Sequence, residues 1–146
     1  MDVKGTLKSA MKAYPEKKKE SKGEPCCDGI KGLISRVFAT RNIVHFAHWN
    51  TKSFAAHEAL GGLYDGIVGK IDEIVEAYQG KYGLIEGATS GMSAVPQDIA
   101  GHVEEELEWI SSNREGISNG CKPIEALLDE LETGYLAALY KLKNLS

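Results

Sequence analysis

The sequence has little of what marks several classes of protein. It has only three cysteines; Cys26 and Cys27 are adjacent and Cys121 stands alone, so neither a disulfide framework nor a paired Cys-x-x-Cys metal motif is visible. No apolar run approaches the roughly 18 residues that a membrane span needs, and the first residues lack the apolar stretch of a signal peptide. These absences predict a cytoplasmic protein with no membrane segment.

A strand pattern is also missing. No stretch alternates apolar and polar residues over enough positions to predict a β-strand. The composition is otherwise ordinary, because 42% of the 146 residues are hydrophobic and 26% are charged. A chain of this length and composition can bury one hydrophobic core, which excludes a disordered tail or a collagen-like repeat. We therefore expect one small all-α domain.

The net charge of −4 divides unevenly along the chain. Residues 1–22 contain seven lysines and three acidic residues, for a net charge of +4, and the rest of the chain carries −8. We expect a flexible basic arm over residues 1–27 and a folded domain over residues 28–146. Two roles for the arm stay open, a contact with DNA phosphates or a contribution to solubility and protein contacts. The DNA-binding candidates are Lys4, Lys8, Lys12, Lys17, Lys18, Lys19 and Lys22.

Apolar residues spaced three and four apart predict four helices. The first runs from residue 28 to a break at 50–53, and the second from about 54 to 78, with Gly80 and Gly83 ending it. The third follows Pro96 and the fourth starts at Pro123. Residues 80–96 are rich in Gly, Ser and Thr and are expected to form a long crossover. The predicted fold is a ferritin-like four-helix bundle, in which such a crossover makes the second and third helices parallel.

Four residues are candidate metal ligands: His48, His57, Asp72 and Glu76. Asp72 and Glu76 are four residues apart and share a helix face, and imidazole and carboxylate groups suit iron. His57 and Asp72 lie about 22 Å apart along one helix, too far to bind one ion within a chain. No Glu-x-x-His motif is present for a di-iron site inside the bundle. If the second helix packs antiparallel against its copy, His57 approaches Asp72 of that copy, which predicts a site shared between subunits.

The same residues carry a family resemblance. His48-Trp49-Asn50, His57-Glu58, Asp72-Glu73 and Glu76 resemble the ferroxidase segment of Dps proteins, the mini-ferritins of the ferritin-like superfamily. The resemblance implies that two His of one subunit and the Asp and Glu of its dimer partner bind iron. It also implies oxidation of Fe²⁺ by peroxide or oxygen and storage of ferric iron in a hollow homo-oligomer, a dodecameric shell with a dimer interface through the second helix. Trp49 would then absorb stray one-electron oxidation.

A second resemblance concerns residues 48–67 and 77–83, which are similar to segments of small uncharacterised ferritin-like proteins of tailed phages. It implies the host-cell cytoplasm or the virion as the location. Gly61 departs from the Dps pattern, because the family has an Asp there that helps to hold a second iron. Asp65 or Glu58 is a candidate replacement, and the link between His48 and His57 is shorter than in typical Dps proteins. These departures keep open a non-enzymatic structural or adaptor protein, such as a phage virion component.

The remaining histidines and a row of small residues receive simpler interpretations. His45 is expected to be a neutral helix residue, with a role as an auxiliary metal ligand as the alternative. His102 is expected to be a solvated side chain beside Glu104–Glu106, a solvent-exposed helix face. The glycines of the second helix cost up to about 1 kcal/mol each relative to alanine. They are tolerable where another helix packs very close, which fits a contact between two copies of this helix. These glycines are Gly61, Gly62, Gly66 and Gly69.

Overall fold

The computed structural model describes residues 28–146, so the arm predicted over residues 1–27 and its lysines lie outside the described residues. The described part forms four helices and contains no β-strand, which confirms the predicted all-α bundle. No helix in this part is long and apolar enough to cross a membrane. The helices are α1 (Asp28–Asn50), α2 (Phe54–Tyr82), α3 (Ile99–Ser118) and α4 (Lys122–Asn144).

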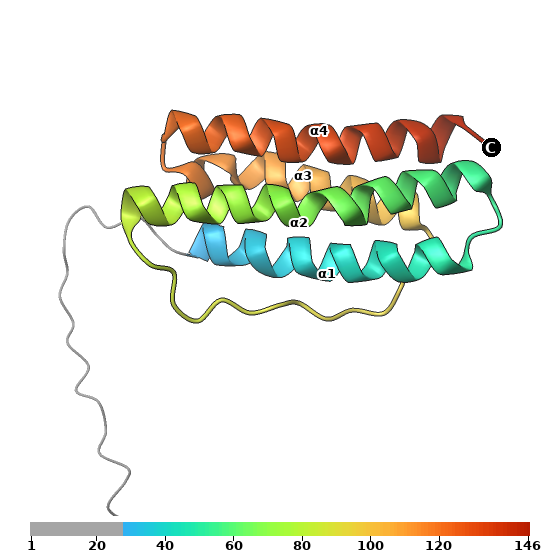
Figure 1. Cartoon of the computed structure of the whole chain (residues 1–146), viewed down its shortest axis with the longest axis horizontal. Coiled ribbons are helices and arrows are strands. Elements are labelled where there is room, and N and C mark those ends of the chain that lie inside the picture. Colours follow the sequence, from blue (N-terminus) through green and yellow to red (C-terminus); the bar gives the residue numbers. More distant parts are fainter. Residues whose placement is uncertain (1–27) are drawn as a thin grey trace, which may run out of the picture.

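The helices form two antiparallel hairpins joined by one long connection (Figure 1). α1 packs against α2 and α3, and α4 packs against the same two helices. The predicted crossover is present between Tyr82 and Ile99 and runs the length of the bundle beside α1, so α2 and α3 point the same way. The backbone N–H of Gly91 donates to the Ser35 carbonyl of α1 at 3.1 Å, which fixes the crossover near its middle.

Local sequence signals set most of the helix ends. The Ser53 hydroxyl accepts a hydrogen bond from the Ala56 N–H at 3.1 Å and caps α2, and the Asp98 carboxylate caps α3 through the Gly101 N–H at 2.8 Å. Asn119, with φ of 48°, ends α3 in the left-handed conformation that Asn tolerates. The short breaks between α1 and α2 and between α3 and α4 are therefore set by Ser53 and Asn119, two residues that favour helix caps.

The end of α2 differs from the prediction. The helix continues through Gly80 and ends at Tyr82, and Gly83 follows as the C-cap residue with a φ of 99° that suits glycine. The additional turn is stabilised from outside α2, because the Tyr82 hydroxyl donates to the Ser118 carbonyl at the end of α3 at 3.0 Å. A contact between distant residues thus extends the helix beyond the point where its own sequence weakens.

The interior of the bundle is almost entirely apolar. One continuous cluster of aliphatic and tyrosine side chains joins all four helices. Thr40, Glu106 and Ser118 are the buried polar residues of the described part. Because the centre holds so few polar groups, candidate chemistry is confined to the helix ends, the outer faces and the surroundings of these residues. The largest fully buried side chains are Tyr78, Tyr135, Ile30, Leu33, Leu60, Ile67, Ile71, Ile74, Ile110, Ile117, Ile124 and Leu128.

Candidate functional site

His48 and His57 form a stacked pair where α1 passes into α2. The short link between the helices places their rings 3.7 Å apart between centroids, at an interplanar angle of 25°. His48 Nδ1 lies 2.8 Å from the His57 carbonyl oxygen, and His57 Nδ1 lies 3.2 Å from the His48 carbonyl oxygen. A carbonyl oxygen only accepts, so both Nδ1 atoms donate, and in the neutral rings each Nε2 carries a free lone pair. This tethering is the one that orients metal-binding histidines.

Gly61 makes room for this pair. A Cβ atom at position 61 would lie 3.2 Å from Cε1 and 3.3 Å from Nδ1 of His48. The His48 ring cannot retreat easily, because it is held by the stack on His57 and by its hydrogen bond. The absence of the Asp expected from Dps proteins therefore has a steric reason. Asp65 and Glu58, the suggested replacements, are exposed on α2.

Three more aromatic rings surround the pair. His45 stacks on Tyr64 with centroids 3.9 Å apart, and the edge of Tyr64 faces His48 at 5.3 Å. Trp49, which is 64% exposed and directly follows His48 in the chain, lies against His45 with ring centroids 4.6 Å apart. We call His45, His48, Trp49, His57 and Tyr64 the histidine–aromatic cluster. His45 was predicted only as a neutral residue or an auxiliary ligand, and Tyr64 was not predicted as a member. His45 lies three residues from His48 and Tyr64 seven residues from His57, on the same helix faces.

Acidification is expected to destabilise the chain through His45. Partial burial, Arg41 and His48 lower the pKa of His45 from its ordinary value of 6.5, so the folded state disfavours its protonation. Its contribution to stability is complete above the unfolded-state pKa and is lost as the pH falls through the lower folded-state pKa. Urea unfolding at about pH 7 and about pH 5 should therefore show a larger loss for the parent than for His45→Phe, which keeps a ring on Tyr64. Equal losses would contradict this role of His45.

The two predicted carboxylate ligands lie further along α2. Asp72 and Glu76 are exposed and one helical turn apart. Neither carboxylate forms a hydrogen bond or an ion pair with any residue between 28 and 146. Within that same range, no group of three or more His, Cys, Asp or Glu side chains is arranged to hold a metal ion. A single chain thus brings His48 to His57 but does not bring this pair to the carboxylates.

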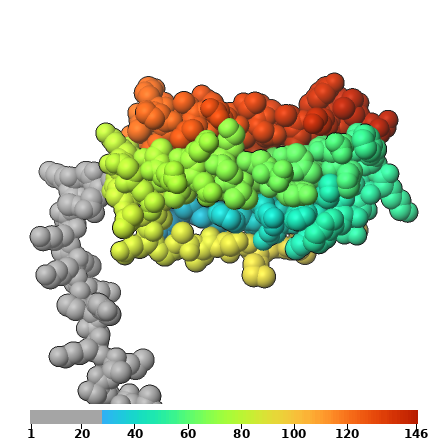
Figure 2. Space-filling model, in the orientation of Figure 1, coloured from blue at the N-terminus to red at the C-terminus, as the bar shows by residue number. Residues whose placement is uncertain are grey.

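The exposed side of α2 consists of glycines and acidic residues. We define the α2 outer face as Gly62, Asp65, Gly66, Gly69, Asp72, Glu73 and Glu76, all exposed. A Cβ atom at any of the three glycines would meet nothing within 4 Å. Figure 2 shows α2 uncovered at the front of the molecule, between α4 and α1. Nothing within the described chain therefore requires glycine at these positions.

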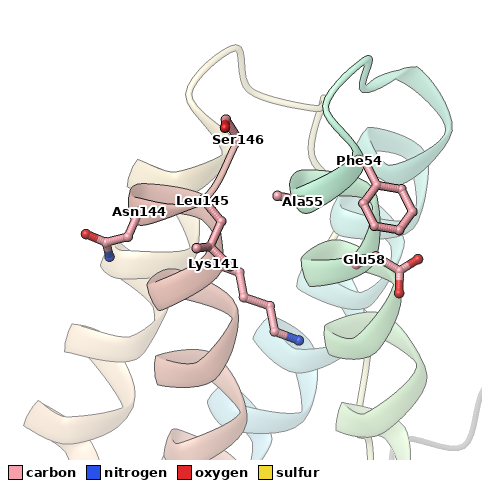
Figure 3. A pocket seen from close by; sticks show the side chains of 7 residues that line it. All are labelled: Phe54, Ala55, Glu58, Lys141, Asn144, Leu145 and Ser146. Atoms are coloured by element: carbon pink, nitrogen blue, oxygen red, sulfur yellow. The ribbon is translucent and has the colours of Figure 1, made fainter.

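A groove opens between the start of α2 and the end of α4 (Figure 3). Its volume is about 460 Å³, and its lining includes Phe54, Glu58, Lys141 and Leu145. Phe54 is 75% exposed. The lining contains a single carboxylate and no histidine, so the groove adds apolar surface to this end of the bundle and no metal-ligand set.

Glu104 and Glu105 of α3 are exposed as expected, but the expectation of a solvated side chain is wrong for Glu106 and for the ring nitrogen Nε2 of His102. Glu106 is buried and its Oε1 accepts from Arg36 Nη1 at 2.8 Å, and His102 Nε2 is inaccessible to solvent. The crossover covers this side of α3, which helical periodicity alone does not reveal. Burial is the largest influence on Tyr135 and raises its pKa above the ordinary value, while Thr40 lowers the pKa and Glu106 raises it, so the phenol stays protonated.

The fold and the site together define a class: a four-helix bundle with one long crossover and a tethered histidine pair at the first hairpin. Residues 48–142 match a family of unknown function, DUF5856. This match spans more than half of the chain, which therefore belongs to that family. It begins at His48 and includes the α2 outer face. No curated protein and no solved structure matches the chain.

Proposed function

We propose that the chain is a subunit of a Dps-like, iron-oxidising homo-oligomer. In this proposal His48 and His57 of one subunit and Asp72 and Glu76 of another bind Fe²⁺, the substrate. The observation that carries it is the reciprocal tethering of the two imidazoles, which commits both Nδ1 atoms to backbone carbonyls and leaves both Nε2 atoms for a ligand.

The second subunit is needed because each half-site is incomplete. Two nitrogen donors lie at the first hairpin, and two free carboxylates lie on the α2 outer face. Antiparallel contact between two α2 helices would combine them into a set of two nitrogen and two carboxylate ligands, which suits iron and leaves positions open for an oxidant. Each Fe²⁺ gives up one electron, and peroxide takes up two electrons and two protons to become water. Ferric iron would then collect inside a hollow assembly.

Charge and shape on the α2 outer face support the same pairing. Its three glycines allow a second helix to approach closely. Its four carboxylates, Asp65, Asp72, Glu73 and Glu76, would repel those of a second copy unless cations lie between them. Bound iron would therefore strengthen the contact between subunits as well as being oxidised there.

Iron oxidation by two matched variants tests the proposal. The parent is expected to oxidise Fe²⁺ with peroxide or oxygen, measured by ferric absorbance, and to retain iron in a large assembly. Replacing Asp72→Asn and Glu76→Gln together removes both anionic ligands and should slow oxidation more than about tenfold, since even outer-shell changes cost 10–100-fold. Glu73→Gln, an exposed carboxylate on the same face, is the control and should leave the rate unchanged. A double variant as fast as the parent would refute the site.

A non-enzymatic structural or adaptor role is the second candidate. It is favoured by the aromatic side chains exposed at the first hairpin, Phe46, Trp49 and Phe54, since exposed apolar patches mark protein interaction sites. Iron bound in a fixed ratio to the chain would decide against this role. The seven lysines of residues 1–22 extend either proposal to sequence-independent DNA binding, which weakens as salt rises.

A further inference from the structure

A polar cavity of about 340 Å³ lies between α1, α3 and the crossover. Arg36 and Thr40 of α1, residues 91–93 of the crossover, and His102 and Glu106 of α3 line it. Its volume is at the small end of the 300–1,000 Å³ range of ligand pockets. None of these residues belongs to the candidate iron site, so the cavity needs an explanation of its own.

Two of the residues that line this cavity carry a buried polar atom that makes no hydrogen bond of ordinary geometry within residues 28–146. Thr40 is fully buried, and its Oγ1 is near enough to Tyr135 to influence the pKa of the phenol but forms no hydrogen bond of ordinary geometry within residues 28–146. His102 Nε2 also lacks a partner in that range. In either neutral tautomer His102 is unsatisfied, because Nε2 lacks an acceptor when protonated and a donor when bare. Folded proteins leave few such atoms unpaired. Both atoms are closed to solvent in this structure, so an occupant reaches them only when a lining side chain turns.

Arg36 and Glu106 place a hydrogen-bond donor beside an acceptor in fixed positions. Their ion pair joins Arg36 Nη1 to Glu106 Oε1 at 2.8 Å, and the Glu106 side chain is only 12% exposed. The Arg36 guanidinium lies 4.5 Å from the centre of the Trp109 ring, which holds it flat. Gly32 allows that ring to approach, because a Cβ there would lie 3.1 Å from it. The ion pair uses one of the five N–H groups of the Arg36 guanidinium. The other N–H groups and Glu106 Oε2 remain for hydrogen bonds to a ligand.

Charge decides the class of occupant. Arg36 and Glu106 neutralise each other, so a charged ligand would lose hydration beside the buried Glu106 without gaining a counter-ion, which is costly. A neutral amide edge, with a carbonyl next to an N–H, matches the adjacent donor and acceptor. Ala39 and Ile43 supply apolar contacts on either side. We propose that this cavity binds a small uncharged molecule with an amide edge, such as a lactam or a nucleobase.

Chemical-shift mapping with defined probes tests this proposal. Uracil and δ-valerolactam at about 10 mM, tenfold above a Kd of about 1 mM, should shift the backbone amide signals of Thr40, residues 91–93 and His102. Acetate and methylammonium, which offer charge without an amide edge, should leave these signals in place. Shifts from the charged probes alone, or no shifts at the cavity from any probe, would overturn the proposal.

Three variants identify the groups that bind the probes. Glu106→Gln should weaken uracil binding about tenfold or more, as expected for the loss of a charge-assisted hydrogen bond, while Glu105→Gln, a neighbouring exposed carboxylate, should not change it. Because Glu106→Gln also alters the ion pair with Arg36, Thr40→Val provides a milder change that removes only the unpaired hydroxyl. It should fold and bind uracil more weakly. Parent-like binding in both Glu106→Gln and Thr40→Val would refute the site, whatever the result for iron oxidation.

Discussion

Oligomers assembled from two inactive chains are expected to regain iron oxidation. One chain carries His48→Asn and His57→Asn, which remove both Nε2 ligands, and the other carries Asp72→Asn and Glu76→Gln. Each alone lacks one half of every shared site. In a mixed twofold dimer one site is doubly damaged, and the other combines the intact histidines of one chain with the intact carboxylates of the other. Random mixing makes half of the dimers mixed, so about a quarter of the parental activity should return.

Refolding the two chains together and separately gives the measurement. The separate oligomers supply the baseline, and the mixture should exceed their average by the stated fraction of parental activity. Mixing the intact oligomers without dissociating them is the control, because no exchange of subunits should give no recovery. If both variants are inactive and no activity returns after co-refolding, the ligands do not come from two chains.

Gly66→Leu is expected to separate the subunits while leaving the bundle folded. Pairing His57 with Asp72 of a second copy centres the crossing of two α2 helices between residues 64 and 65, within about 4 Å of Gly62 and Gly66 along the axis. Inserted bulk costs about 1–3 kcal/mol per site, and the twofold axis doubles it. The dimer Kd should therefore rise about 30-fold or more, as measured by sedimentation equilibrium.

Gly80→Leu is the matched control for this substitution. Gly80 is also exposed on α2 with nothing within 4 Å of its would-be Cβ, but it lies far from the expected crossing. Within a single chain, leucine at either position improves helix propensity, by up to about 1 kcal/mol. Both variants should thus unfold at slightly higher urea concentration as monomers, and only Gly66→Leu should weaken association. Equal association of the two variants would refute the helix pairing.

Much of the fold could be predicted from local signals. The period of 3.6 residues, the capping Ser53 and the turn at Asn119 lie in the sequence itself and predict the helices and their order. The length of the Gly- and Ser-rich connection predicts the crossover. The last turn of α2 could not be predicted, because it depends on the hydrogen bond from Tyr82 to Ser118, residues of different hairpins.

The candidate site likewise has one part that the sequence predicts and one part that depends on the whole fold. The short link between α1 and α2 makes the proximity of His48 and His57 predictable, but the stacking of their rings and the space left by Gly61 depend on the register between the helices. The burial of His102 and Glu106 depends on where the crossover lies, since their spacing along α3 suits an exposed face equally well. Loop position is a property of the whole fold and has no local signature.

The hydrogen bond from His57 Nδ1 to the His48 carbonyl also has a consequence for α1. That carbonyl belongs to the last turn of the helix, where no further N–H of α1 is available to it. His57 thus acts as the C-terminal capping donor of α1 from outside the helix. Alanine at position 57 would fray this end, whereas the amide N–H of asparagine can keep the cap. The same imidazole therefore closes a helix with one nitrogen and presents the other to solvent, and His57→Asn separates the two roles.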